Sequence, residues 1–135
     1  MFGRKAADVA GARKRELEGL VAAMHRSQAV IEFALDGTIL DANDNLLAAM
    51  GYAKAEVVGR RHAMFMPPGE ADLPEYRAFW AQLNRGEYVA SKFRRLGKSG
   101  REVWIQASYN PVFDETGKPC KVIKFATDVT QAEYE

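Results

Sequence analysis

The stretch that most constrains the fold of this chain is Arg94–Thr130, near its C-terminal end. Turn-forming residues interrupt it at Lys98–Gly100 and again at Gly117–Pro119, and β-branched and aromatic residues fill the intervals between them. Gly and Pro at such intervals are typical of strands joined by tight turns. The pattern predicts the end of one strand, followed by long strands over Arg101–Phe113 and Lys121–Val129.

Side chains of the strand over Arg101–Phe113 alternate between two faces, because successive residues of a strand point to opposite sides of the sheet. One face carries Val103, Ile105, Ala107 and Tyr109. The other face carries Trp104, Gln106, Ser108 and Asn110. The strand therefore mixes apolar and hydrogen-bonding groups, and such a surface can form one wall of a ligand pocket.

Two shorter strands and a group of small helices precede this region. Strands are predicted over Ala29–Leu35 and Thr38–Asp41, because the Asp-Gly pair between them is a strong hairpin signal. Small helices are predicted over Asp44–Met50, with Asn43 as the N-cap, and over Lys54–Val58. This part of the chain is therefore two strands followed by small helices.

The next segment, Arg60–Leu73, is the least regular and contains His62, Met66 and a Pro-Pro pair that forbids a continuous helix. Irregular apolar backbone beside a His is typical of a cofactor wall, but we favour the other interpretation, a loop packed against a core. A helix is predicted over Pro74–Asn84, with an aromatic stripe that includes Trp80. Such a stripe is typical of core packing.

The order of these elements, completed by a strand over Tyr88–Leu96, predicts an α+β fold. It has a five-stranded antiparallel sheet with helices gathered on one face. A length of 135 residues with 47% hydrophobic content is enough for one sizeable core and too short for two domains. We expect one domain over residues 28–130, a flanking helix over residues 1–27, and the start of a linker over residues 131–135.

The N-terminal segment, residues 8–28, predicts an amphipathic helix with a narrow apolar stripe. The stripe consists of Leu17, Leu20, Val21 and Met24. Either this helix packs on the sheet of its own domain or it pairs with a second copy of itself, and both arrangements can hold at different ends. Because the stripe is too narrow to bury on both sides of a sheet, we expect a homodimer through these four residues.

The charge balance gives no case for a nucleic-acid or acidic-membrane partner, since 19 basic and 18 acidic residues leave a net charge of +1. No apolar run approaches the roughly 18 residues that a membrane span requires, and the N-terminus lacks the apolar core of a signal peptide. We therefore expect a soluble, cytoplasmic protein. The single cysteine, Cys120, excludes an internal disulfide and a multi-cysteine metal site.

A series of short motifs, in their order and spacing, resembles the successive signatures of a PAS sensory domain. The motifs are Asp36–Asn43, Met50–Tyr52, Glu56–Gly59, Lys98–Gly100 before Val103–Trp104, and Phe125–Thr130. The resemblance extends over residues 27–130. It implies the PAS fold for most of the chain.

Within this family the chain looks most like the PAS modules of bacterial methyl-accepting chemotaxis proteins, including the flavin-binding aerotaxis receptors. The likeness lies in the His-x-Met of Gly59–Met64 and in Val103–Ala107, which places a Trp at the matching strand position. The closing Asp128–Thr130 resembles the family's DIT-type ending, where the domain passes its signal to a following helix. The resemblance implies a sensory input module for oxygen, redox state or a small ligand, followed by a downstream signalling domain.

The resemblance also implies a cofactor in the pocket, either haem b or, as the alternative, FAD. For haem, His62 would be the axial iron ligand. For flavin, Phe65–Gly69 departs from the family's pattern, so the charged residues that hold a flavin phosphate are not matched, and Cys120 is not placed for adduct chemistry. The expected cofactor-binding residues are Asn43, His62, Met66, Trp80, Trp104, Gln106 and Asn110.

The expected mechanism is a shift between two packings of the flanking helices. An event at the cofactor would alter hydrogen bonds to the inward face of the last three strands, where we expect Trp104, Gln106 and Asn110. No catalytic constellation appears in the sequence, so we do not expect an enzyme. The alternative function is a cofactor-free PAS module for dimerisation or interaction.

Overall fold

An antiparallel sheet of five strands forms the centre of the chain in a computed structural model, which describes residues 2–135 and their side chains from residue 5 onward. The strands are β1 (Ala29–Phe33), β2 (Ile39–Ala42), β3 (Val89–Leu96), β4 (Glu102–Phe113) and β5 (Pro119–Asp128). Their order across the sheet is β2-β1-β5-β4-β3, so the first and last strands are neighbours at its centre. The predicted five-stranded antiparallel sheet is confirmed, and each predicted strand end lies within two residues of the observed end.

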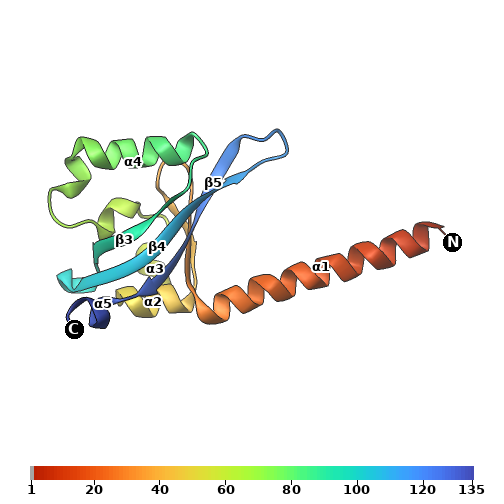
Figure 1. The fold of residues 1–135 in the computed structure, drawn as a ribbon, viewed down its shortest axis with the longest axis horizontal. Helices are drawn as coiled ribbons and strands as arrows, with labels where there is room; N and C mark the ends of the chain where they lie inside the picture. The colour runs from red at the N-terminus through yellow and green to blue at the C-terminus, as the bar shows by residue number, and fades with distance from the viewer. Residues whose placement is uncertain (1) are drawn as a thin grey trace.

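The helices that cover the sheet lie on one of its faces (Figure 1). They are α2 (Asp44–Met50), α3 (Lys54–Val57) and α4 (Pro74–Asn84), with the 3₁₀ turns η1 (His62–Phe65) and η2 (Glu70–Asp72) between α3 and α4. The side chain of Asn43 accepts a hydrogen bond from the backbone N–H of Leu46 at 3.0 Å, which caps α2 as predicted. The observed bounds of α2 and α4 agree with the predicted ones.

The core lies between this face of the sheet and the helices. Alternation along β4 places four of its side chains in the core, and they are Val103, Ile105, Ala107 and Tyr109. The intervening side chains, from Trp104 to Asn110, are half-buried or exposed. The sheet therefore has one buried face and one face that is open over much of its area.

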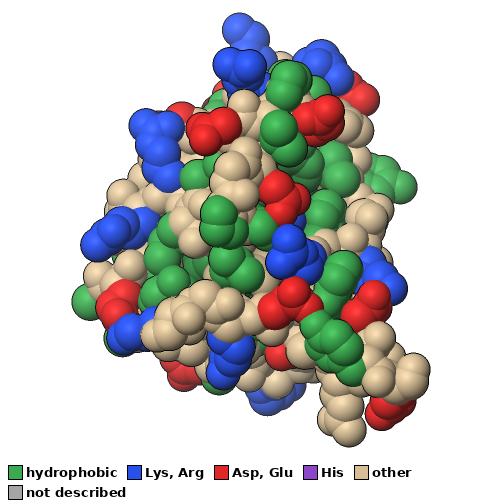
Figure 2. Space-filling view, turned by 90° about the vertical axis from the view of Figure 1, so that its left-hand side faces the viewer, with side chains coloured by type: hydrophobic (Ala, Val, Ile, Leu, Met, Phe, Trp, Pro, Cys, Tyr) green, Lys and Arg blue, Asp and Glu red, His purple; other side chains and the backbone are tan. Residues whose placement is uncertain are grey.

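The outer surface carries charges of both signs. On the side of the molecule seen in Figure 2, Lys and Arg side chains are interspersed with Asp and Glu, and hydrophobic side chains show between them. No helix within residues 2–135 combines the length and the apolar character that a bilayer crossing requires.

Helix α1 (Phe2–Ser27) extends away from the sheet (Figure 1). The side chains of its stripe, Leu17, Leu20, Val21 and Met24, are between 39% and 55% exposed. Of the two arrangements considered for this helix, packing of the stripe on the sheet of its own domain is therefore not observed. The C-terminal end of the helix is held where the side chain of Asn45 donates to the carbonyl of His25 at 2.9 Å and that of Asn43 donates to the carbonyl of Gln28 at 2.9 Å.

The turn between β3 and β4, which contains η3 (Lys98–Gly100), packs against the end of α2. The side chain of Arg101 donates to the carbonyl of Ala49 at 2.7 Å. A Cβ atom on Gly97 would lie 2.6 Å from the carbonyl oxygen of Met50, a distance that requires one backbone to shift. Gly97 thus allows the close approach that fixes α2 against this turn.

We expect Gly97→Ala to lower the free energy of unfolding by about 1–3 kcal/mol, because the added methyl group overlaps backbone atoms rather than a mobile side chain. Urea unfolding followed by circular dichroism measures the change. Gly19→Ala is the matched control, since a Cβ there meets nothing within 4 Å and alanine favours the helix. Equal stability of the two variants would contradict the close approach at Met50.

Candidate functional site

His62 lies at the centre of the core, and its side chain is fully buried. Backbone hydrogen bonds hold the segment before it against the β1–β2 turn. The N–H of His62 donates to the carbonyl of Gly37 at 2.8 Å, and the N–H of Ile39 donates to the carbonyl of Arg60 at 2.7 Å. The irregular stretch between α3 and α4 therefore delivers the imidazole to the interior at a defined position.

Both ring nitrogens of His62 have hydrogen-bond partners. Nδ1 lies 2.8 Å from the hydroxyl of Tyr76 on α4, and Nε2 lies 2.8 Å from the hydroxyl of Tyr109 on β4. Burial lowers the pKa of His62 well below its usual value, and the cationic groups of Lys124 and Arg95 lower it further. The imidazole is therefore neutral near pH 7, with one nitrogen donating a proton and the other accepting one.

Six aromatic rings surround this imidazole, with ring centroids between 5.3 and 6.3 Å from its own. The rings belong to Phe33, Phe65, Tyr76, Phe79, Trp80 and Tyr109. Trp80 is thus brought to His62, in an edge-to-face arrangement at 5.5 Å. These residues come from β1, η1, α4 and β4, so that the imidazole connects both layers of the domain.

Two further basic side chains reach the same place, and sequence reasoning missed both. Arg95 on β3 is 6% exposed, and Lys124 on β5 is 3% exposed. The Nη2 of Arg95 donates to the Tyr109 hydroxyl at 3.4 Å, and the Nζ of Lys124 lies 4.8 Å from the centroid of the Tyr109 ring. We call these two residues, His62 and its six aromatic neighbours the His62 cluster.

No carboxylate forms an ion pair with Arg95 or Lys124 in the described part of the chain. The Nε of Arg95 is buried and has no hydrogen-bond partner there. Burial, and then the charge of Arg95, lower the pKa of Lys124 well below its usual value. The cluster therefore holds basic side chains whose hydrogen-bonding capacity is only partly satisfied.

Two spaces border the His62 cluster. An open groove of about 160 Å³ lies outside it, lined by Met66, Glu70, Leu73, Glu75, Tyr76, Phe79 and Phe93. An enclosed cavity of about 10 Å³ lies inside, beside Lys124 and Phe65. The inner cavity is large enough for one water molecule at most. Tyr76 and Phe79 thus separate the outer groove from His62.

The structure brings only some of the predicted site residues together. His62 and Trp80 lie in the cluster, and Met66 lines the outer groove. Asn43 lies elsewhere, because its side chain caps α2 and also accepts from the N–H of Val30 at 3.0 Å. Its amide belongs to the junction with α1 rather than to the interior.

The expected inward orientation of Trp104, Gln106 and Asn110 is wrong, because the alternate residues of β4 face the core. The indole Nε1 of Trp104 donates to Glu102 at 2.9 Å, and Gln106 is exposed. The side chain of Asn110 donates to the carbonyl of Ile123 at 3.2 Å, across to β5. These three residues lie on the outer face of the sheet, away from His62.

An axial haem bond from His62 does not fit this packing. Such a bond requires one free ring nitrogen that faces the iron, whereas both nitrogens of His62 are engaged by tyrosine hydroxyls. Within the described residues, no group of three or more His, Cys, Asp or Glu side chains is placed to hold a metal ion. The predicted metal role of His62 therefore has no support from its surroundings.

A flavin also does not fit the interior as it is packed. The enclosed cavity of about 10 Å³ has no room for a three-ring system, and the aromatic rings around His62 fill the space beside it. Binding of a flavin would require α4 to move its side chains away from the sheet.

We expect Lys124→Met to raise the free energy of unfolding by about 1–3 kcal/mol at pH 7, because methionine keeps the length of the side chain and removes the cost of burying an amine that has no ion pair among the described residues. The unfolded chain binds the Lys124 proton more tightly than the folded one, so the wild type gains stability as the pH rises toward 10.5. The advantage of the variant should therefore shrink between pH 7 and pH 9.

Urea unfolding at the two pH values measures this difference. Lys118→Met is the control, since Lys118 is exposed and its replacement should change stability by about 0.5 kcal/mol or less. A Lys124→Met protein less stable than the wild type would show that the amine has a partner that stabilises the fold.

Comparison with known proteins agrees with this architecture. A protein-family model described as the PAS fold matches residues 39–126. Biofilm dispersion protein BdlA of Pseudomonas aeruginosa is 51% identical over 118 residues, which cover 87% of this chain and 28% of that protein. The chain spans 17% of the length of a second, more distant relative.

Solved structures show the same fold. The PAS domain of a protein from Colwellia psychrerythraea superposes with a TM-score of 0.73 at 24% identity, over 85% of this chain and 98% of that one. A light-oxygen-voltage domain studied with a flavin analogue superposes with a TM-score of 0.70 at 23% identity, over 85% of this chain and 87% of that one. The resemblance to PAS domains is confirmed, and because the family model matches more than half of its length, this chain belongs to the PAS family.

Proposed function

We propose that this chain is the sensory input module of a bacterial chemotaxis-type signal transducer, and that it responds to a small ligand at the His62 cluster. The observation that carries the proposal is the burial of Arg95 and Lys124 without any carboxylate partner among the described residues. Buried charges that serve only stability are paired. We infer that this unpaired set receives a ligand.

The chemotaxis assignment is supported by the His-x-Met within Gly59–Met64 and by the 51% identity to the biofilm dispersion protein. In that setting the domain acts on a signalling domain of the same receptor, and its work is regulation rather than catalysis. We also propose that the protein is located in the cytoplasm.

The two strands that carry the cluster also lead to the end of the domain. Lys124 pairs with Tyr109 across β5 and β4. Four residues further along β5, the side chain of Asp128 accepts from the N–H of Thr130 at 2.9 Å and so holds the start of α5 (Thr130–Glu133). The hydroxyl of Thr130 in turn accepts from the N–H of Trp104 on β4 at 2.9 Å. A displacement of the Tyr109–Lys124 pair can therefore be transmitted to α5 along a short stretch of β5.

A coupling of roughly 1–3 kcal/mol between ligand and helix packing is typical of such switches. Trp104, Gln106 and Asn110 take part in this proposal from the outer face of the sheet, not as ligand contacts. Glu102 links Trp104 to the residue that follows α5, because its carboxylate accepts from the indole of Trp104 and from the hydroxyl of Tyr134.

Flavin is the alternative ligand. The similarity of the fold to that of a light-oxygen-voltage domain favours it. To bind in this chain, a flavin would have to displace the aromatic side chains of α4 from His62. A haem would in addition have to break one of the two hydrogen bonds to that imidazole. A small ligand requires the least rearrangement of the three.

We expect the purified protein to show neither a Soret band nor flavin absorption bands, before and after incubation with each cofactor, because the cluster leaves no room for either ring system. Absorbance spectra after gel filtration measure this directly. Hydrogen exchange that slows in both β5 and α5 on addition of a binding ligand would support the sensory role. A flavin spectrum retained through gel filtration would replace the small-ligand proposal by the flavin one.

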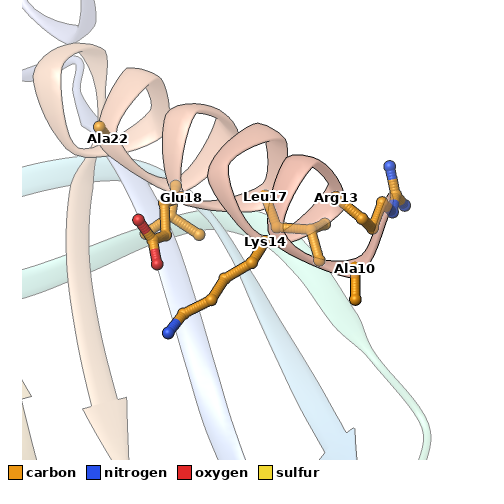
Figure 3. Close-up of a pocket in the computed structure, with 7 residues that line it drawn as sticks. Ala10, Arg13, Lys14, Leu17, Glu18 and Ala22 are labelled. Carbon is orange, nitrogen blue, oxygen red and sulfur yellow. The ribbon is translucent and has the colours of Figure 1, made fainter. Parts of the chain in front are cut away.

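A homodimer through α1 is part of the proposal, and the exposed stripe of that helix favours it. The exposed side of α1 around Leu17 and Val21 is an open surface formed by residues of α1 alone, and it includes Ala10 and Ala22. Figure 3 shows Ala10, Lys14 and Leu17 projecting from one side of the helix. A second copy of α1 would cover this apolar side and bring its own acidic and basic residues beside Lys14 and Glu18. The same stripe favours the second candidate, a cofactor-free module for dimerisation.

We expect the double variant Leu20→Glu, Met24→Glu to weaken the dimer by at least tenfold or about 1.4 kcal/mol, because it places two charges in the apolar stripe. Light scattering over a concentration series measures the change. The control is Ala12→Glu, Ala23→Glu, which adds the same two charges on another side of the helix. A wild-type protein that stays monomeric throughout the series would defeat the homodimer.

A further inference from the structure

The interior of this domain is basic without a compensating acid. The buried polar or charged side chains of the described residues are His62, Arg95 and Lys124. Glutamate and aspartate side chains remain at the surface, where they pair with exposed lysines and arginines. Burying a cation without a counter-ion costs several kcal/mol. An anion from outside the chain would lower this cost if it bound beside these groups.

The basic groups converge on Tyr109 from two strands and a turn, with Arg95 on β3, Lys124 on β5 and His62 in η1. Nε2 of His62 and Nη2 of Arg95 lie 2.8 and 3.4 Å from the Tyr109 hydroxyl. Lys124 pairs with Tyr109 in the sheet, and its Nζ lies above the face of the tyrosine ring. An anion beside this hydroxyl would meet charged donors from two sides.

Arg95 presents the edge of its guanidinium that suits a carboxylate. Its Nη1 is used by the carbonyl of Arg94 at 3.2 Å, whereas its Nε has no partner and its Nη2 has only the long contact to Tyr109. Nε and Nη2 form one edge of the planar fork, and a carboxylate binds such an edge through two parallel hydrogen bonds. The ring of Phe93, 4.6 Å from the guanidinium carbon, holds the plane of the fork.

We propose that the His62 cluster binds a small organic carboxylate, with its carboxylate group held by Arg95, Lys124 and the Tyr109 hydroxyl. The apolar part of the ligand lies among Phe79, Phe93 and the outer groove, which contains Met66 and Leu73. This inference rests on the proposed sensory function and names the class of its ligand. Inorganic phosphate suits the site less well, because its four oxygens would have to be buried among aromatic rings.

Entry of the ligand requires Tyr76 and Phe79 to move, since the inner cavity of about 10 Å³ is too small for a carboxylate with a side chain. Both residues belong to α4, whose aromatic side chains are only half-buried. Tyr76 also bonds to His62, so that its movement frees Nδ1 of that imidazole. Ligand binding and a change in the position of α4 are thereby linked.

The test uses the whole chain and a panel of carboxylates, namely acetate, hexanoate, benzoate and phenylacetate, with benzamide and inorganic phosphate as comparisons. Thermal unfolding and titration calorimetry at low salt measure binding. We expect at least one carboxylate with an apolar part to stabilise the wild type, and its neutral amide to have no effect. Lys124→Met and Arg95→Met should each weaken binding at least about tenfold, the usual loss for one hydrogen bond to a charged group.

Lys124→Met keeps this test interpretable, because it is expected to fold more stably than the wild type while losing the ligand. Lys118→Met is the matched surface control and should bind as the wild type does. Carboxylate binding that survives both interior variants would overturn the proposal, and so would phosphate binding as tight as that of the best carboxylate, or no binding by any member of the panel.

The outcomes also separate this inference from the proposed function. Benzamide that binds as tightly as benzoate, with binding lost in Phe79→Ala, would leave small-ligand sensing in place and defeat the carboxylate. Conversely, carboxylate binding that leaves hydrogen exchange of β5 and α5 unchanged would establish the site and defeat its sensory role.

Discussion

The two hydrogen bonds to the ring of His62 hold together parts of the chain that are far apart in sequence. Tyr76 brings α4 to the imidazole, Tyr109 brings β4, and the backbone N–H of His62 bonds to the β1–β2 turn. A neutral imidazole is suited to this position because it satisfies one donor and one acceptor without a buried charge. The burial that keeps it neutral is produced by the same aromatic rings that it orders, so that packing and protonation state depend on each other.

The regular elements could be predicted from sequence because their signals act over a few residues. Asn43 caps α2 through an atom three residues from the N–H that it satisfies, and Pro74 needs only its own ring to suit the first turn of α4. The strands follow from alternation and turn residues in the same way. The position of α1 could not be predicted, because periodicity shows that one side of a helix is apolar and does not show what covers that side.

The candidate site could be predicted only in part. His62 and Met66 stood out because they lie in an irregular apolar stretch. The orientation of β4 was predicted wrongly, because each of its faces carries an aromatic residue and Trp104 was expected on the inner one. Tyr109 takes the inner face because its hydroxyl finds His62 there, a contact between residues 47 positions apart in the chain. The signal for Lys124 was its place in the alternation, between the inward residues Val122 and Ala126. Because lysine side chains are normally exposed, the inward position of Lys124 could be recognised only from the strand pairing of the folded sheet.

The way α1 is attached turns small rotations into large displacements. Its 26 residues make a rod roughly 39 Å long, and the hydrogen bonds that Asn43 and Asn45 make with residues 25–28 hold its base. Each degree of tilt at that base moves the far end by roughly 0.7 Å, by the length of such a helix. A rearrangement of α2 too small to disturb the packing of the core is therefore enough to displace the tip of this rod. The displacement of the far end for a given tilt at the base is therefore set by the length of α1 rather than by the stability of the domain.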